Sequence, residues 1–233
     1  MDRRRFVTLC ASTPLLAGLA GHRAFAGPMV DYPAAELVDA DGAPLKASAI
    51  PTGEALIFSY PFRAIPCFLI RLRSRTETVD ELSTMDGESY RSPAGVGPDS
   101  SLVAFVAICT HQLSYPTAQA SFLSYASDTG ALADAPGRIV CCAHGSVFDP
   151  SRGARLVAGP APSPLLPVRL AHDPETDRLR ATGSLGEAFF RRFFDAYKGD
   201  LIERYGPGVY RQPVDGTSVA LPQSRYSAVV AGC

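Results

Sequence analysis

Cys109-Thr110-His111 and Cys141-Cys142-Ala143-His144-Gly145-Ser146 are the two stretches around which the rest of the chain is organised. An apolar run of strand length, residues 102–108, leads into the first stretch, and Ile139-Val140 leads into the second. Each stretch then presents a thiol and an imidazole on a short connection, where functional groups supported by a rigid scaffold commonly lie. Thiolates and neutral imidazoles bind metals, so the pattern predicts a metal centre held between two loops.

Three kinds of site fit two thiols and two imidazoles. A 2Fe–2S cluster of the Rieske type has both imidazoles on one iron and both thiolates on the other. A structural zinc ion takes the same four ligands in a closed tetrahedron. In an oxidising compartment, two of the cysteines can instead form a disulfide, with the histidines incidental. The four residues alone therefore leave open a redox centre and a zinc- or disulfide-stabilised binding module without a redox role.

Residues that continue the second stretch favour the redox centre. The sequence resembles the Rieske iron–sulfur family, whose two loops read C-T-H and C-x-C-H-G-S. The resemblance implies one 2Fe–2S cluster, and it places Gly145 beside that cluster as part of the family pattern. The metal ligands that it implies are Cys109, His111, Cys141 and His144.

Three more residues are implied to surround the cofactor. Gly159-Pro160-Ala161-Pro162 resembles the proline-rich third loop of the family, so Pro160 is expected to cover the cluster. Ser146 matches the family serine whose hydroxyl donates a hydrogen bond to a bridging sulfur. Phe148 stands where high-potential members have tyrosine, so one hydrogen bond to a ligand sulfur is expected to be missing. We expect a reduction potential below that of quinol-oxidising members and above that of members lacking both donors.

The second loop departs from the cytochrome bc branch of the family. The disulfide that joins the two loops in that branch has its cysteine positions here at Ser114 and Ala143, so that disulfide cannot form. Cys142 stands where that branch has proline, and it is a second candidate for the thiolate ligand, although the family spacing favours Cys141. Without the inter-loop disulfide, the cluster is expected to depend more on the surrounding loops.

Two further cysteines lie outside both ligand loops. Cys67 falls in the apolar run 66–70 and is expected to be a buried core thiol. Cys233 is predicted to lie on a mobile end, where an unpaired thiol would favour adventitious dimers.

Residues 1–26 have the features of a twin-arginine export signal. Arg3-Arg4-Arg5 precede Phe6, an apolar run follows, and Ala24-Phe25-Ala26 offers a cleavage site of the small-x-small type. The apolar run is shorter than the roughly 20 residues that span a bilayer. We therefore expect a cleaved signal and a periplasmic protein. A retained N-terminal membrane anchor is the alternative.

The pattern of the remaining chain predicts an all-β fold with a C-terminal helix and an irregular tail. Residues 73–99 are predicted to form a surface excursion with a short helix near 79–82, and residues 112–138 an inserted hairpin or helical turn. The resemblance implies a Rieske-type antiparallel β-sandwich base with a small cluster-binding subdomain. Short β-branched and aromatic runs bounded by turn residues indicate strands at 35–38 (an edge strand), 54–60, 66–72, 102–108, 165–170 and 179–183.

Three segments are predicted: the signal at 1–26, a Rieske domain at 27–183, and a C-terminal part at 184–233. The cluster-binding subdomain is expected at about 105–164. Apolar residues between 186 and 205 repeat with a helical period, which predicts a helix that packs on its own domain or, alternatively, docks a partner.

The composition bounds the function. The chain has 233 residues, 46% of them hydrophobic, and a net charge of −1, so nothing indicates nucleic-acid binding. No Ser/His/Asp set, phosphate-binding loop or paired carboxylate indicates an independent substrate site, and whether the chain is an enzyme stays open. The resemblance implies an electron-transfer subunit of an oxidoreductase of the arsenite oxidase type, between a larger catalytic subunit and a cytochrome. The alternative is a membrane-anchored Rieske subunit of a quinol–cytochrome c reductase.

Overall fold

The computed structural model describes residues 29–233. The predicted signal segment, 1–26, lies outside the described residues.

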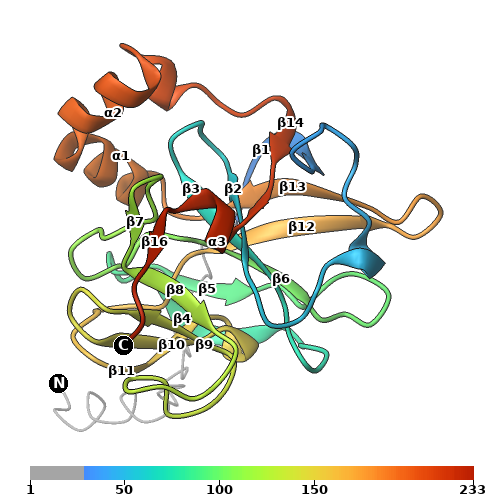
Figure 1. The fold of residues 1–233 in the computed structure, drawn as a ribbon, viewed down its shortest axis with the longest axis horizontal. Helices are drawn as coiled ribbons and strands as arrows, with labels where there is room; N and C mark the ends of the chain where they lie inside the picture. Colours follow the sequence, from blue (N-terminus) through green and yellow to red (C-terminus); the bar gives the residue numbers. More distant parts are fainter. Residues whose placement is uncertain (1–28) are drawn as a thin grey trace, which may run out of the picture.

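Two β-sheets form the body of the molecule (Figure 1). The large sheet is antiparallel except for the β1–β14 pair. In order across the sheet its strands are β14 (Gly216–Val219), β1 (Val30–Val38), β13 (Arg178–Ser184), β12 (Pro167–Asp173), β6 (Leu102–Val106), β3 (Pro66–Arg71), β2 (Leu56–Ser59) and β15 (Leu221–Pro222). The small antiparallel sheet contains β11 (Arg155–Ala158), β10 (Ser146–Asp149), β9 (Arg138–Cys141) and β8 (Leu123–Ala126). The predicted all-β class is confirmed.

The centre of the large sheet is buried on both faces, which explains why β3 and β6 are continuously apolar in sequence. Cys67 and Leu69 of β3 point into one core, whereas Phe68 and Ile70 point into a second core that also contains residues of the small sheet. Residues on β6 alternate in the same way. The second core therefore lies between the two sheets, and Cys67 is the buried thiol that the sequence predicts.

Helices α1 (Glu187–Ala196) and α2 (Lys198–Tyr205) follow β13 in the chain, and Tyr197 separates the two helices. The predicted single helix is thus two helices. Its apolar stripe packs on the domain itself, because four phenylalanines of α1 are buried in the first core: Phe189, Phe190, Phe193 and Phe194.

Two predictions of local structure are wrong. Residues 79–82 are not helical: β4 (Val79–Ser83) pairs with β5 (Ser89–Ser92). The apolar residues Val79 and Leu82 are three positions apart, as in a helix, and the strand has a register shift between them. The tail after Gly206 is not irregular. It contains β14, β15, α3 (Gln223–Tyr226) and β16 (Val229–Val230), and β14 covers β1, which is consequently not an edge strand.

The inserted segment 112–138 contributes β7 (Ala120–Ser121) and β8, and β8 forms a hairpin with β9. The prediction of a hairpin inside the segment is thus right only in part, because the partner strand β9 begins at its last residue, Arg138. Short 3-10 turns complete the fold: η1 (Ala47–Ala49), η2 (Pro150–Arg152) and η3 (Val209–Arg211). Among residues 29–233, no helix is long and apolar enough to cross a membrane.

Candidate metal centre

The two predicted thiolate ligands meet in the core between the sheets. Cys109 follows β6 on the face of Val103 and Phe105, and Cys141 ends β9 on the face of Ile139. Both thiols are buried and neither is in a disulfide. Strand alternation on two facing sheets therefore delivers one thiol from each sheet to the same place.

The two facing thiols shift each other's pKa in opposite directions. The Cys109 thiol, together with the main-chain N–H groups of Ala143 and His144, lowers the pKa of Cys141 to about 6. The same contact with Cys141, followed by burial, raises the pKa of Cys109. One of the two sulfurs is therefore already disposed to be the thiolate that a metal requires.

The two predicted imidazole ligands also form a pair. The ring centroids of His111 and His144 are 4.8 Å apart, with the ring planes at 85°. The Nδ1 atom of His111 is buried and has no hydrogen-bond partner. A buried ring nitrogen left unpaired is costly, and a metal bond satisfies it. His144 is exposed, so the pair reaches the surface through that residue.

Thiols in one pair and imidazoles in another is the division of ligands that a Rieske-type 2Fe–2S cluster requires. Within the part of the chain that the structure describes, no three His, Cys, Asp or Glu side chains converge on a single metal ion. The orphaned His111 nitrogen and the facing thiols show that the residues present fit a two-iron cluster with a separate ligand pair for each iron.

Main-chain hydrogen bonds fix both ligand loops. In the first loop, the N–H of Leu113 donates to Cys109 O at 2.9 Å and the N–H of Cys109 donates to Ser114 O at 2.8 Å. In the second loop, the N–H of Gly145 donates to Cys141 O at 2.8 Å. The ligand pairs are thus held by closed loops.

The proline-containing third loop packs on both ligand loops. The N–H of Ala161 donates to the hydroxyl of buried Ser146 at 3.2 Å. The hydroxyl of Thr110 donates to Ser163 O at 2.7 Å. Pro160, between these contacts, is exposed at the surface of the site. The pattern of ligands in the sequence did not reveal that Thr110 and Ser163 join the first ligand loop to the third loop.

Cys142 does not share the position of Cys141. It contacts the small apolar cluster of Val140 and Val147, which lies on the other face of β9 and β10. Its sulfur forms a disulfide with Cys233. The expectation that Cys233 is an unpaired thiol on a mobile end is therefore wrong. Cys142 and Cys233 are the two cysteines that remain once Cys10 of the export segment, the two ligands and Cys67 are assigned. That remainder of two indicated the pairing.

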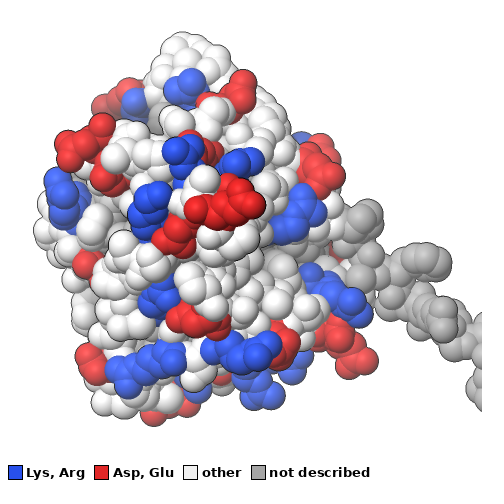
Figure 2. Space-filling view, turned by 90° about the vertical axis from the view of Figure 1, so that its right-hand side faces the viewer, with Lys and Arg blue, Asp and Glu red and all other residues white. Residues whose placement is uncertain are grey.

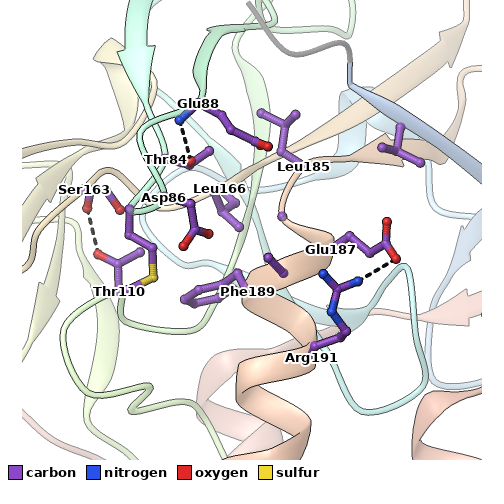
Figure 3. Close-up of a pocket in the computed structure, with 14 residues that line it drawn as sticks. Thr84, Asp86, Glu88, Thr110, Ser163, Leu166, Leu185, Glu187, Phe189 and Arg191 are labelled. Carbon is purple, nitrogen blue, oxygen red and sulfur yellow. Dashed lines mark hydrogen bonds and ion pairs between the residues drawn. The ribbon is translucent and has the colours of Figure 1, made fainter.

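A cavity of about 330 Å³ lies behind the first ligand loop and is lined in part by Thr110 and Ser163 (Figure 3). Arg191 on its wall pairs with Glu187 at 2.8 Å, and Asp86 pairs with Arg192 at 2.7 Å. No cysteine or histidine lines the cavity. It therefore adds no ligand to the metal centre.

The two-sheet fold brings a pair of thiols and a pair of imidazoles together, which is the donor set of a redox metal centre in a β protein. Residues 83–172 match the family model of the Rieske [2Fe-2S] domain, and all four predicted ligands fall within that range. The chain therefore contains a Rieske [2Fe-2S] domain, which implies a 2Fe–2S cluster and a role in electron transfer. Among solved structures, it is similar to the soluble domain of the Rieske protein II (soxF) from Sulfolobus acidocaldarius. The sequence identity is 24% and the TM-score 0.48, over 66% of this chain and 78% of that chain.

Removing the Ser146 hydroxyl is expected to lower the reduction potential. Ser146 is fully buried and lies within hydrogen-bonding reach of the Cys109 sulfur. A donor to a ligand sulfur stabilises the more negative, reduced state. A hydrogen bond to a charged group contributes about 1.5 kcal/mol or more, so Ser146→Ala should lower the potential by about 60 mV. Redox titration measures this shift. Ser163→Ala, a buried serine of the third loop whose hydroxyl donates to Pro164 O, is the control and should leave the potential unchanged.

Adding a hydroxyl at Phe148 is expected to act in the opposite direction. Phe148 is fully buried in the core that contains Cys109 and Cys141, and it shares a face of β10 with Ser146. Phe148→Tyr would place a donor in that core, so the potential should rise by some tens of millivolts. Redox titration beside the unsubstituted protein tests this, and a potential that stays level or falls contradicts it.

Proposed function

We propose that Cys109, Cys141, His111 and His144 hold the 2Fe–2S cluster and that the protein is an exported electron carrier. In this role it relays single electrons as the small subunit of a periplasmic oxidoreductase complex. The observation that carries the proposal is the facing pair of buried thiols beside a pair of imidazoles that opens to the surface at His144. When bound, the cluster accepts and donates one electron at a time.

The surface around His144 supports contact with a redox partner. Gln112, Ala143, Pro160 and Pro162, from the three loops, are exposed near the imidazole pair, and none of them is charged. A partner protein can therefore approach this end of the site without removing charged groups from water, whose burial is costly. We propose a larger catalytic subunit or a cytochrome as the partner.

The charge distribution supports a protein partner over nucleic acid. On the face that Figure 2 shows, lysine and arginine side chains are interspersed with aspartate and glutamate. The net charge of the whole chain is −1. A nucleic-acid-binding surface needs a basic stripe that follows the phosphates, and this face has none.

The periplasmic location rests on the N-terminal sequence and on the disulfide. The twin-arginine route carries folded proteins, so a cluster can be inserted before export. Stable disulfides such as Cys142–Cys233 are typical of oxidising compartments. Fractionation of the producing cells, with N-terminal sequencing of the mature protein, tests the location. A chain retained in the membrane with its first 26 residues would indicate instead an anchored subunit of the quinol–cytochrome c reductase type.

Electron paramagnetic resonance of the dithionite-reduced protein tests the ligand set. A rhombic signal with an average g value well below that of an all-cysteine cluster is expected, together with two irons per chain. A colourless, silent protein that contains zinc would exclude the redox function and favour a structural metal site.

A further inference from the structure

Residues 227–233, here called the C-terminal strap, lie along the segment that follows the first ligand loop. Strand β16 of the strap pairs in parallel with β7. The N–H of Ala228 donates to Ala118 O at 2.8 Å, and the N–H of Ala231 donates to Ser121 O at 2.9 Å. Just before β16, the hydroxyl of Ser227 donates to Thr117 O at 2.6 Å. The strap is thus fixed to residues 117–121.

The far end of the strap is bonded to the second ligand loop. Cys233 forms the disulfide with Cys142, the residue next to the thiol ligand Cys141. The N–H of Leu132 donates to Cys233 O at 3.2 Å, and the N–H of Cys142 donates to Phe122 O at 2.7 Å. The second ligand loop is therefore held through both the main chain and the side chain of Cys142. In Figure 1 the C-terminus accordingly ends beside the small sheet.

The near end of the strap is anchored as well. The amide nitrogen of Gln223, which is buried, donates to Ser121 Oγ and to Leu123 O, both at 2.8 Å. The segment 223–233 therefore runs between a buried polar anchor and a covalent bond, without a free end.

Burial of apolar side chains does not account for this placement. The two residues of β16, Val229 and Val230, remain 60% and 39% exposed. The strap is joined to the domain mainly by main-chain hydrogen bonds and by one disulfide. These bonds connect the segment after the first ligand loop to the second ligand loop.

We propose that the strap is a brace that holds the two ligand loops together, and that the Cys142–Cys233 disulfide is its positioning bond. The inference rests on the proposed ligand set. Ligands that are fixed in the geometry of the bound cluster retain it better than ligands on mobile loops, because supporting contacts typically change metal affinity 10–100-fold. Breaking the disulfide leaves the loop of Cys141 and His144 held at Cys142 only by the main-chain hydrogen bond to Phe122, so the cluster should be lost faster.

The test compares the double variant Cys142→Ser/Cys233→Ser with the unsubstituted protein. Using serine at both positions also removes Cys142 as a competing thiol. The denatured proteins are alkylated with and without prior reduction by dithiothreitol, and the modified cysteines are counted by mass spectrometry. Reduction should add two modified cysteines in the unsubstituted chain. It should add none in the double variant. Bleaching of the cluster absorbance in the presence of a chelator should be about tenfold faster in the double variant. Its paramagnetic resonance signal should be broadened, which a purely structural tail would not cause.

Matched controls keep the inference testable. Val229→Ser/Val230→Ser changes the exposed side chains of the strap but leaves the disulfide, and it should bleach at the unsubstituted rate. If the double serine variant folds poorly, Cys142→Ser with deletion of residues 232–233 removes the bond while keeping the hydrogen bonds of β16.

The possible failures are distinct. Equal bleaching rates and identical resonance signals in the unsubstituted protein and the disulfide-free variant would overturn the brace. The proposed ligand set would then still stand. Free thiols at Cys142 and Cys233 in the native protein would also overturn it. An unsubstituted protein without the two-histidine signal would overturn the ligand set, and the brace with it.

Discussion

Cys141→Ser is expected to give a folded protein almost free of cluster, whereas Cys142→Ser is expected to give a protein that still contains it. The two cysteines are adjacent, yet their side chains lie on opposite faces of the small sheet. Cys141 faces Cys109 in the core between the sheets, and Cys142 faces Val140 and Val147. Only Cys141 can complete the thiol pair without rearrangement of β9.

The expected difference between these variants is large. Loss of a supporting contact lowers metal affinity about 10–100-fold, and loss of a ligand should exceed that range. Iron content per chain and the visible absorbance of the purified variants measure occupancy. Cys142→Ser should be isolated with full occupancy and then bleach about tenfold faster in chelator, because it also removes the disulfide.

Two outcomes would contradict the ligand assignment. An occupied Cys141→Ser variant together with an empty Cys142→Ser variant would make Cys142 the ligand. Equal occupancy in both would show that the adjacent thiols substitute for each other. Circular dichroism in the far ultraviolet, recorded on both variants, separates loss of cluster from loss of fold.

Much of the site could be predicted from the sequence because its determinants are local. The run 102–108 is apolar without alternation, as expected of a strand buried on both faces, and β6 is such a strand. A strand of this kind fixes the direction of the next side chains, so Cys109 emerges toward the small sheet. The spacing of Cys141 and His144 then brings the other thiol and the other imidazole to the loop that faces Cys109 and His111.

The remaining features depend on contacts between distant segments, which a local pattern does not encode. The disulfide joins residues 91 positions apart, and cysteine spacing alone does not determine such a pairing. Strands β15 and β16 contain two residues each and are specified by main-chain pairing with β2 and β7, not by a repeat of apolar side chains. The helical expectation for residues 79–82 failed for a related reason: the irregularity in β4 alters the two-residue period of the strand.

Gly159→Ala is expected to destabilise the protein by about 3 kcal/mol or more and to accelerate loss of the cluster. Gly159 has φ +93°, and a Cβ atom there would overlap Gly145 O and Ser146 Cα. Both of these atoms belong to the main chain of the second ligand loop, so no side-chain rotation relieves the contact. The expected cost combines about 1–2 kcal/mol for the left-handed backbone with about 1–3 kcal/mol for overpacking.

Gly208→Ala is the matched control, because Gly208 also has a positive φ, +77°, but nothing lies within 4 Å of the added Cβ. This variant should lose only the backbone contribution of about 1–2 kcal/mol and should retain its cluster. In a chain of this length 1 kcal/mol corresponds to roughly 2–4 °C in Tm, so thermal unfolding should separate the two variants by several degrees. The additional loss of stability in Gly159→Ala then measures how closely the third loop packs on the second ligand loop. Equal losses would mean that the third loop can move away from Gly145 and Ser146 without cost, and that its contact with Ser146 does not hold the cluster.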